Sequence, residues 1–121
     1  MATTLARQPM SGSSVIGDDI KNRQDETLGT VHEIMIDCST GRVAYVVMSS
    51  GGFLGFGNKL FAIPMTALEL DTQDECMRLN ASKDVFEESR GFDKDNWPNM
   101  ADSQWETATH AHFEAPHYWE V

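Results

Sequence analysis

The chain has 121 residues, of which 40% are hydrophobic, and 19 acidic against 9 basic residues give it a formal net charge of −10. This length predicts a single domain with tails. The excess of acid argues against direct nucleic-acid binding, which depends on Lys and Arg neutralising phosphates. The sequence lacks both the run of about 18 apolar residues that spans a membrane and the apolar core of a secretory signal. We therefore expect a cytoplasmic protein without membrane insertion.

The first part of the chain is predicted to be an arm followed by a short strand. Residues 1–12 show no periodicity and are typical of a flexible N-terminal arm. Ser14, Val15 and Ile16 before Gly17 predict a short strand. The acidic and amide residues at 18–22 then indicate a turn region.

A longer strand is predicted from Leu28 to Asp37. Its apolar residues do not alternate strictly, because the step from Val31 to Ile34 is odd. A β-bulge near His32–Glu33 would place Val31, Ile34 and Ile36 on one face. A helical reading is disfavoured by the β-branched residues of the segment.

The next strand is predicted to be covered on both faces. Residues 37–42 form a hairpin connection in which Gly41 is available for positive φ. From Arg42 to Ser49, apolar residues occupy both alternating sets. One face would fill a small barrel, and the other needs a cover from the tail or from another subunit.

The remaining segments complete an all-β pattern. A strand is expected at Leu60–Pro64, an extended or turn-like segment at Met65–Leu70, and a further strand at Cys76–Asn80. Ser82 is expected to cap a helical turn that closes near Gly91. Short strands bounded by Gly, Asp and Asn predict a small β-barrel with one short helical turn.

Residues 91–121 differ from the rest in their aromatic content. The aromatic residues are spaced too widely for one amphipathic helix, and a disordered tail rarely carries so many. We expect this extension to pack on its own barrel or on a second subunit. The predicted organisation is therefore an arm (1–12), a barrel (13–90) and an aromatic extension (91–121).

These features together resemble the PRC-barrel family, whose module occurs in the photosynthetic reaction-centre H subunit and in the ribosome-maturation factor RimM. The resemblance covers about residues 13–87. It rests on Val15-Ile16-Gly17, Leu28-Gly29-Thr30-Val31, Ile34-Met35-Ile36-Asp37, Gly41 to Val47, Gly51-Gly52 with Leu54-Gly55, Lys59 to Pro64, Leu68 and Leu79. The stretch from Gly91 to Pro98 looks like that of stand-alone bacterial members.

The resemblance also implies a type of function. An H subunit carries an N-terminal membrane helix and RimM carries a domain before its barrel, and neither pattern is seen here. The resemblance therefore implies a single-domain cytosolic member. Such barrels bind proteins and self-associate, and they supply no catalytic residues to transfer.

The glycine-rich loop at 51–59 invites a phosphate-binding interpretation. A Walker loop requires GxxxxGK followed by Ser or Thr at the start of a helix. Here Asn58 interrupts the pattern, Leu60 takes the hydroxyl position, and a strand follows. We expect an interface loop instead, because exposed aromatic residues would otherwise favour aggregation.

The C-terminal HAHFEAPH motif is the strongest metal-like pattern. His110 and His112, two residues apart, would share a face of an extended strand, and His117 lies close in sequence. Imidazole suits Zn, Ni or Cu, but no cysteine or scaffold accompanies these residues. We predict no metal and no cofactor, with these three histidines as the candidate ligands if one binds.

No catalytic residues are predicted. The acidic pairs lack a partner nucleophile, and we expect them to be solvated surface. Cys38 and Cys76 are expected to be reduced thiols without an electropositive environment.

The leading hypothesis is a non-enzymatic interaction module that forms a homodimer and acts as an adapter or regulator, with an unidentified partner in a membrane or ribosomal complex. The alternatives are a ribosome-associated factor, by analogy with RimM, and a metal-binding protein. The predicted contact residues are Phe53, Leu54, Phe56, Trp97, Trp105, Tyr118 and Trp119.

Overall fold

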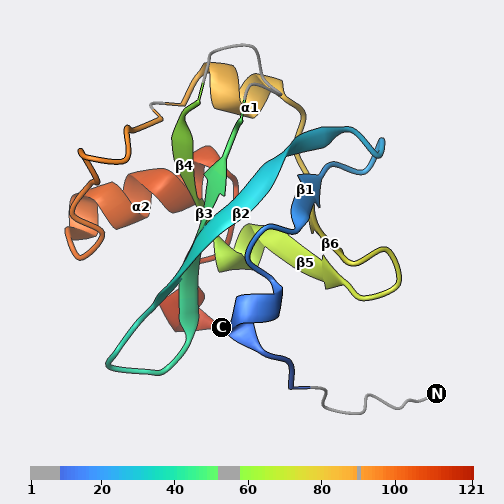
Figure 1. Cartoon of the computed structure of the whole chain (residues 1–121). Coiled ribbons are helices and arrows are strands. Elements are labelled where there is room, and N and C mark those ends of the chain that lie inside the picture. Colours follow the sequence, from blue (N-terminus) through green and yellow to red (C-terminus); the bar gives the residue numbers. More distant parts are fainter. Residues whose placement is uncertain (1–8, 52–57, 90) are drawn as a thin grey trace.

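The computed structural model describes residues 9–51, 58–89 and 91–121, and it contains one sheet of six strands (Figure 1). The strands are β1 (Asp19–Lys21), β2 (Thr27–Ile36), β3 (Val43–Ser49), β4 (Leu60–Pro64), β5 (Leu68–Asp71) and β6 (Cys76–Leu79). The helical elements are η1 (Gly12–Ser14), η2 (Met65–Ala67), α1 (Asp84–Glu87), α2 (Ser103–His112) and η3 (Tyr118–Glu120). The predicted all-β class is confirmed.

The order of the strands explains why this sheet curls. The order is β4-β3-β2-β1-β6-β5, with neighbours antiparallel except for the parallel pair β1–β6. The edge strands β4 and β5 are connected only by η2, so the chain advances by four residues from Pro64 at the end of β4 to Leu68 at the start of β5. Four extended residues span at most about 14 Å, and the edges must therefore lie close together. The sheet forms an open barrel, and β4 and β5 do not pair within the described residues.

The bulge predicted in β2 is confirmed. Val31 pairs with Met48 and Glu33 pairs with Val47, so His32 is the extra residue. A second shift in register lies between Met35 and Ile36.

The two shifts decide which residues of β2 reach the core. Val31 lies in the main core and Ile34 packs against it, as predicted. Ile36 was expected on the same face, but it is 60% exposed. That expectation was wrong because the second shift changes the direction of the side chain at the end of the strand.

Strand β3 is covered on both faces, as predicted. Val46 and Met48 belong to the main core, whereas Ala44 and Tyr45 belong to a second cluster. Tyr118 of the C-terminal extension completes that second cluster, and α2 lies beside β3 and β4 in Figure 1. In this chain the extension therefore covers the outer face of its own sheet.

The strand expected at Ser14–Ile16 is not present. Gly12–Ser14 form η1, Val15 turns into the core at 4% exposure, and Gly17 has a φ of +92°. Strand β1 instead occupies Asp19–Lys21, where a turn was expected. Burial of the Val15 side chain from a turn therefore decides the conformation of this segment, against its propensity to form a strand.

The extension contains a helix that was not predicted. Asp102 caps α2 by accepting a hydrogen bond from Gln104 N, and the helix continues to His112. Its covered side includes Trp105, Thr109 and His110, with Phe113 following. Because Thr and His interrupt the apolar side, the helical period is hard to detect from hydropathy.

Two smaller points concern the helices. Ser82 does not cap α1: Lys83 takes the N-cap position, and no side chain bonds there. Within the part of the chain that the structure describes, no helix is long and apolar enough to cross a membrane.

Candidate interaction surfaces

A cluster of aromatic rings, which we call the Tyr45 cluster, joins the extension to the sheet. It consists of Tyr45 on β3, Trp105 and His110 on α2, and Tyr118 on η3. The centroid of the Tyr45 ring lies 5.1 Å from that of Trp105, 5.5 Å from that of His110 and 5.8 Å from that of Tyr118. Aromatic pairs with such near-perpendicular planes contribute about 0.5–1.5 kcal/mol each beyond their buried area. The cluster therefore fixes the extension on β3.

Hydrogen bonds to Tyr118 reinforce this attachment. The hydroxyl of Tyr118 donates to Asp37 Oδ2 at 2.6 Å, and Arg42 donates to the backbone oxygen of Tyr118 at 2.7 Å. Bonds from the Ser39 hydroxyl and then from Tyr118 lower the pKa of Asp37 to about 2. Burial raises the pKa of Tyr118, so it remains a hydrogen-bond donor at neutral pH. The β2–β3 hairpin thus holds the end of the chain.

The buried imidazole of His110 completes the attachment. Its Nδ1 lies 2.7 Å from the backbone oxygen of Glu106 and must donate to it, which leaves Nε2 to accept from the backbone N–H of Tyr118 at 3.4 Å. Burial lowers the pKa of His110, which favours the neutral ring that this arrangement needs. The role of His110 in the described structure is therefore to bind α2 to η3.

Tyr45 has a hydroxyl that the structure leaves without a partner. The residue is 1% exposed, and its oxygen makes no hydrogen bond to any residue that the structure describes. A buried polar group without a partner costs about 1–3 kcal/mol.

We predict that Tyr45→Phe will leave stability unchanged or raise it by up to about 1 kcal/mol, measured by urea unfolding. Tyr118→Phe is the matched control and should lower stability, because it removes the bond to Asp37. A clear loss of stability in Tyr45→Phe would contradict this prediction.

The predicted contact residues occupy different environments. Trp97 is 37% exposed and Trp119 is 40% exposed, whereas Trp105 is half-buried and Tyr118 is buried. The last two pack within their own chain, in the Tyr45 cluster. Phe53, Leu54 and Phe56 lie outside the described residues, as does most of the glycine-rich loop.

Trp97 and Trp119 are each held from one side by their own chain. Trp97 lies 5.2 Å from Phe92 between ring centroids, and its indole N–H donates to the backbone oxygen of Lys94 at 2.8 Å. Trp119 stacks on His117 with centroids 4.6 Å apart. Both indoles are therefore positioned side chains with surface left to contact another molecule.

The candidate metal ligands do not form one site. The rings of His110 and His117 lie 5.4 Å apart, but His112 Nε2 lies 2.7 Å from the backbone oxygen of Val85. The expectation that His110 and His112 share a strand face was wrong, because α2 is helical here. Within residues 9–51, 58–89 and 91–121, no group of three His, Cys, Asp or Glu is arranged to hold a metal ion.

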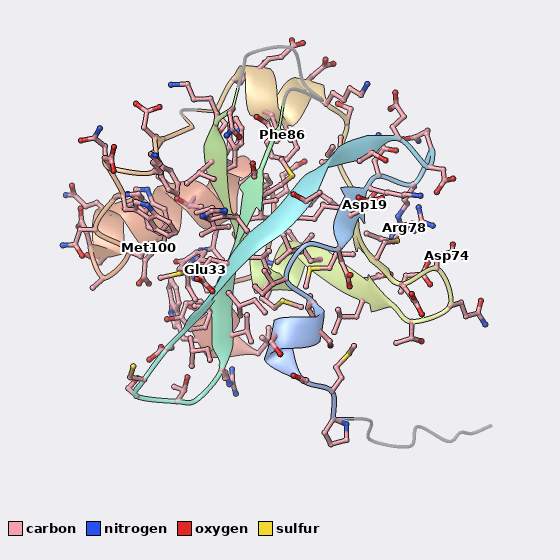
Figure 2. The ribbon with its side chains drawn as sticks, viewed as in Figure 1. Asp19, Glu33, Asp74, Arg78, Phe86 and Met100 are labelled. Carbon is pink, nitrogen blue, oxygen red and sulfur yellow. The ribbon has the colours of Figure 1, made fainter. Side chains whose placement is uncertain are left out.

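An arginine on β6 organises several acidic residues that sequence reasoning did not connect. Arg78 forms ion pairs with Asp25 at 2.8 Å, Asp71 at 3.2 Å and Asp74 at 2.8 Å. Figure 2 shows Arg78 and Asp74 on the side of β5 and β6, far from Met100 beside α2. The carboxylates of Asp25 and Asp74 are largely exposed, so their pairs with Arg78 contribute little to stability, whereas the pair with Asp71 is half-buried. These pairs tie the β1–β2 and β5–β6 connections together.

The two thiols are in different environments. Cys76 is buried in β6, and burial raises its pKa, which disfavours a reactive thiolate. Cys38 is exposed in the β2–β3 hairpin.

Comparison with known proteins agrees with this architecture. A family model described as PRC-barrel domain matches residues 9–86, which is well over half of the chain and includes all six strands. A search of curated proteins found no match. Helix α2 and the Trp residues of the extension follow the matched region. The chain belongs to the PRC-barrel family.

Proposed function

We propose that this protein is a non-enzymatic interaction module that self-associates and serves as a cytoplasmic adapter or regulator. PRC-barrel domains are in general non-catalytic, which supports the first part of the proposal. The observation that carries the second part is the exposure of Trp97 and Trp119 at 37% and 40%. Tryptophan is enriched among residues that dominate binding energy at interfaces.

The positions of these two residues strengthen the argument. Each indole is fixed by its own chain, so little side-chain entropy is lost when a partner covers its remaining surface. Both belong to the extension, which the Tyr45 cluster fastens to the sheet. We propose that a second copy of the chain contacts these indoles.

Light scattering across a dilution series tests this proposal. We expect a dimer mass at micromolar concentration, and a monomer mass for the Trp97→Ser/Trp119→Ser variant. Leu70→Ser is the matched control, because Leu70 is 46% exposed on β5 and lies outside the extension. Far-UV circular dichroism checks that each variant is folded. A monomer at every concentration of the unmodified protein would refute self-association.

A further inference from the structure

A small pocket lies between the N-terminal segment and the β5–β6 hairpin, and we call it the Leu70 pocket. It has a volume of about 330 Å³ and is lined by Met10, Ser14, Asp18, Leu70, Asp71, Thr72, Glu75 and Cys76. Met10 is 49% exposed and Leu70 is 46% exposed. This volume is at the low end for ligand sites, so it suits one or two side chains better than a large cofactor.

The rim of the Leu70 pocket is negatively charged. Asp18, Asp71 and Glu75 line it, and none of the described residues that line it is basic. Asp71 forms an ion pair with Arg78, but no ion pair to Asp18 or Glu75 is formed by the described residues. Glu75 is held in a left-handed conformation with a φ of +52°, at the turn before β6. Two carboxylates that pair with no cation of the described residues thus border two exposed apolar side chains.

We propose that the Leu70 pocket binds a basic, amphipathic segment of a partner protein. An apolar side chain of the segment enters between Met10 and Leu70, and its Lys or Arg side chains pair with Asp18 and Glu75. The segment and the pocket carry complementary charges, and binding also buries apolar surface on both. This inference deepens the proposed interaction role by naming the chemistry of a partner, and it does not depend on the homodimer.

The charge distribution argues against a second copy of this chain as the occupant. The exposed indoles of the extension lie next to acidic residues in sequence, with Asp95 near Trp97 and Glu120 beside Trp119. Insertion of either indole would bring carboxylates toward Asp18 and Glu75, and like charges at an interface are unfavourable. The overall charge of −10 likewise favours a basic partner.

A labelled hexapeptide that alternates lysine and leucine tests this proposal by fluorescence anisotropy. We expect it to bind, whereas hexapeptides alternating glutamate with leucine or lysine with serine should not. The Asp18→Asn/Glu75→Gln variant should bind the lysine–leucine peptide about tenfold more weakly, at about threefold for each exposed charge pair removed. Leu70→Ser should also weaken binding.

A matched control variant distinguishes binding at the Leu70 pocket from general electrostatic attraction between the basic peptide and the acidic protein. Asp95→Asn/Glu87→Gln changes the net charge by the same amount, at two exposed carboxylates that do not line the pocket. We expect less than a twofold effect from it. Equal losses in the two double variants, or no binding of the lysine–leucine peptide at millimolar concentration, would overturn the proposal. Light scattering on the same samples shows separately whether the protein self-associates, so failure of one proposal is distinguishable from failure of the other.

Discussion

Replacing Gly29 with alanine is expected to lower the free energy of unfolding by about 2–3 kcal/mol. Gly29 lies in β2 where that strand pairs with β1, one residue before pairing with β3 begins. A Cβ atom at this position would clash with the backbone oxygen of Ser49 and would lie 2.8 Å from Met48 Cγ. The methionine can move, but the backbone oxygen belongs to the neighbouring strand. Relief therefore requires β2 and β3 to separate, and such overpacking typically costs about 1–3 kcal/mol.

Urea unfolding of Gly29→Ala gives the measurement, and Gly12→Ala is the matched control. A Cβ at Gly12 would meet nothing within 4 Å, so this variant should stay within about 0.5 kcal/mol of the original protein. The midpoint of Gly29→Ala should fall without a change in the slope of the transition. Equal stability of the two variants would show that the sheet absorbs the methyl group.

The features of the sheet that depend on short-range pattern were predictable from the sequence. The bulge at His32 follows from the odd step between Val31 and Ile34, and the two-faced burial of β3 follows from its unbroken apolar run. Both signals arise from neighbours along the chain. The exposure of Ile36 was missed because a second shift in register depends on the pairing partner in β3.

Helix α2 was missed for a different reason. Its buried side includes Thr109 and His110, and a buried His is an acceptable core residue only because specific backbone groups satisfy both of its nitrogens. Hydropathy counts that histidine as polar, and so the helical period is lost. The aromatic content of the extension predicted that it packs on a barrel, and within this chain Tyr118 of the extension lies in one cluster with Tyr45 of β3.

The surfaces were harder to predict than the sheet. The link from Asp37 to Tyr118 joins residues 81 positions apart, and the Leu70 pocket joins Met10 to the β5–β6 hairpin. No local period encodes either contact. Trp97 and Trp119, which remain exposed, were among the predicted contact residues, and so was Tyr118, which is buried. Only the tertiary structure distinguishes the exposed residues from the buried one.

Replacing Phe86 with alanine is expected to have the largest effect, a loss of about 3–5 kcal/mol of stability. Phe86 is 1% exposed in α1, and its ring centroid lies 5.0 Å from that of Phe61 on β4 and 6.0 Å from that of Phe113 after α2. Its ring therefore connects the sheet to the extension. The truncation leaves a cavity at that junction, and it removes both aromatic contacts.

The tryptophans allow this connection to be measured directly. All three (Trp97, Trp105 and Trp119) lie in the extension, so tryptophan fluorescence reports on the extension alone, whereas far-UV circular dichroism reports on the six strands as well as on α2. In the original protein we expect the two unfolding transitions to coincide, as for one cooperative unit. In Phe86→Ala the fluorescence midpoint should fall below the circular dichroism midpoint, because the extension loses a contact that the sheet does not require to pair its strands.

Glu87→Ala, at the exposed next residue of the same helix, is the control and should change neither transition. Coincident transitions in Phe86→Ala would contradict this prediction. They would mean that the Tyr45 cluster and the hydrogen bonds to Tyr118 hold the extension without Phe86.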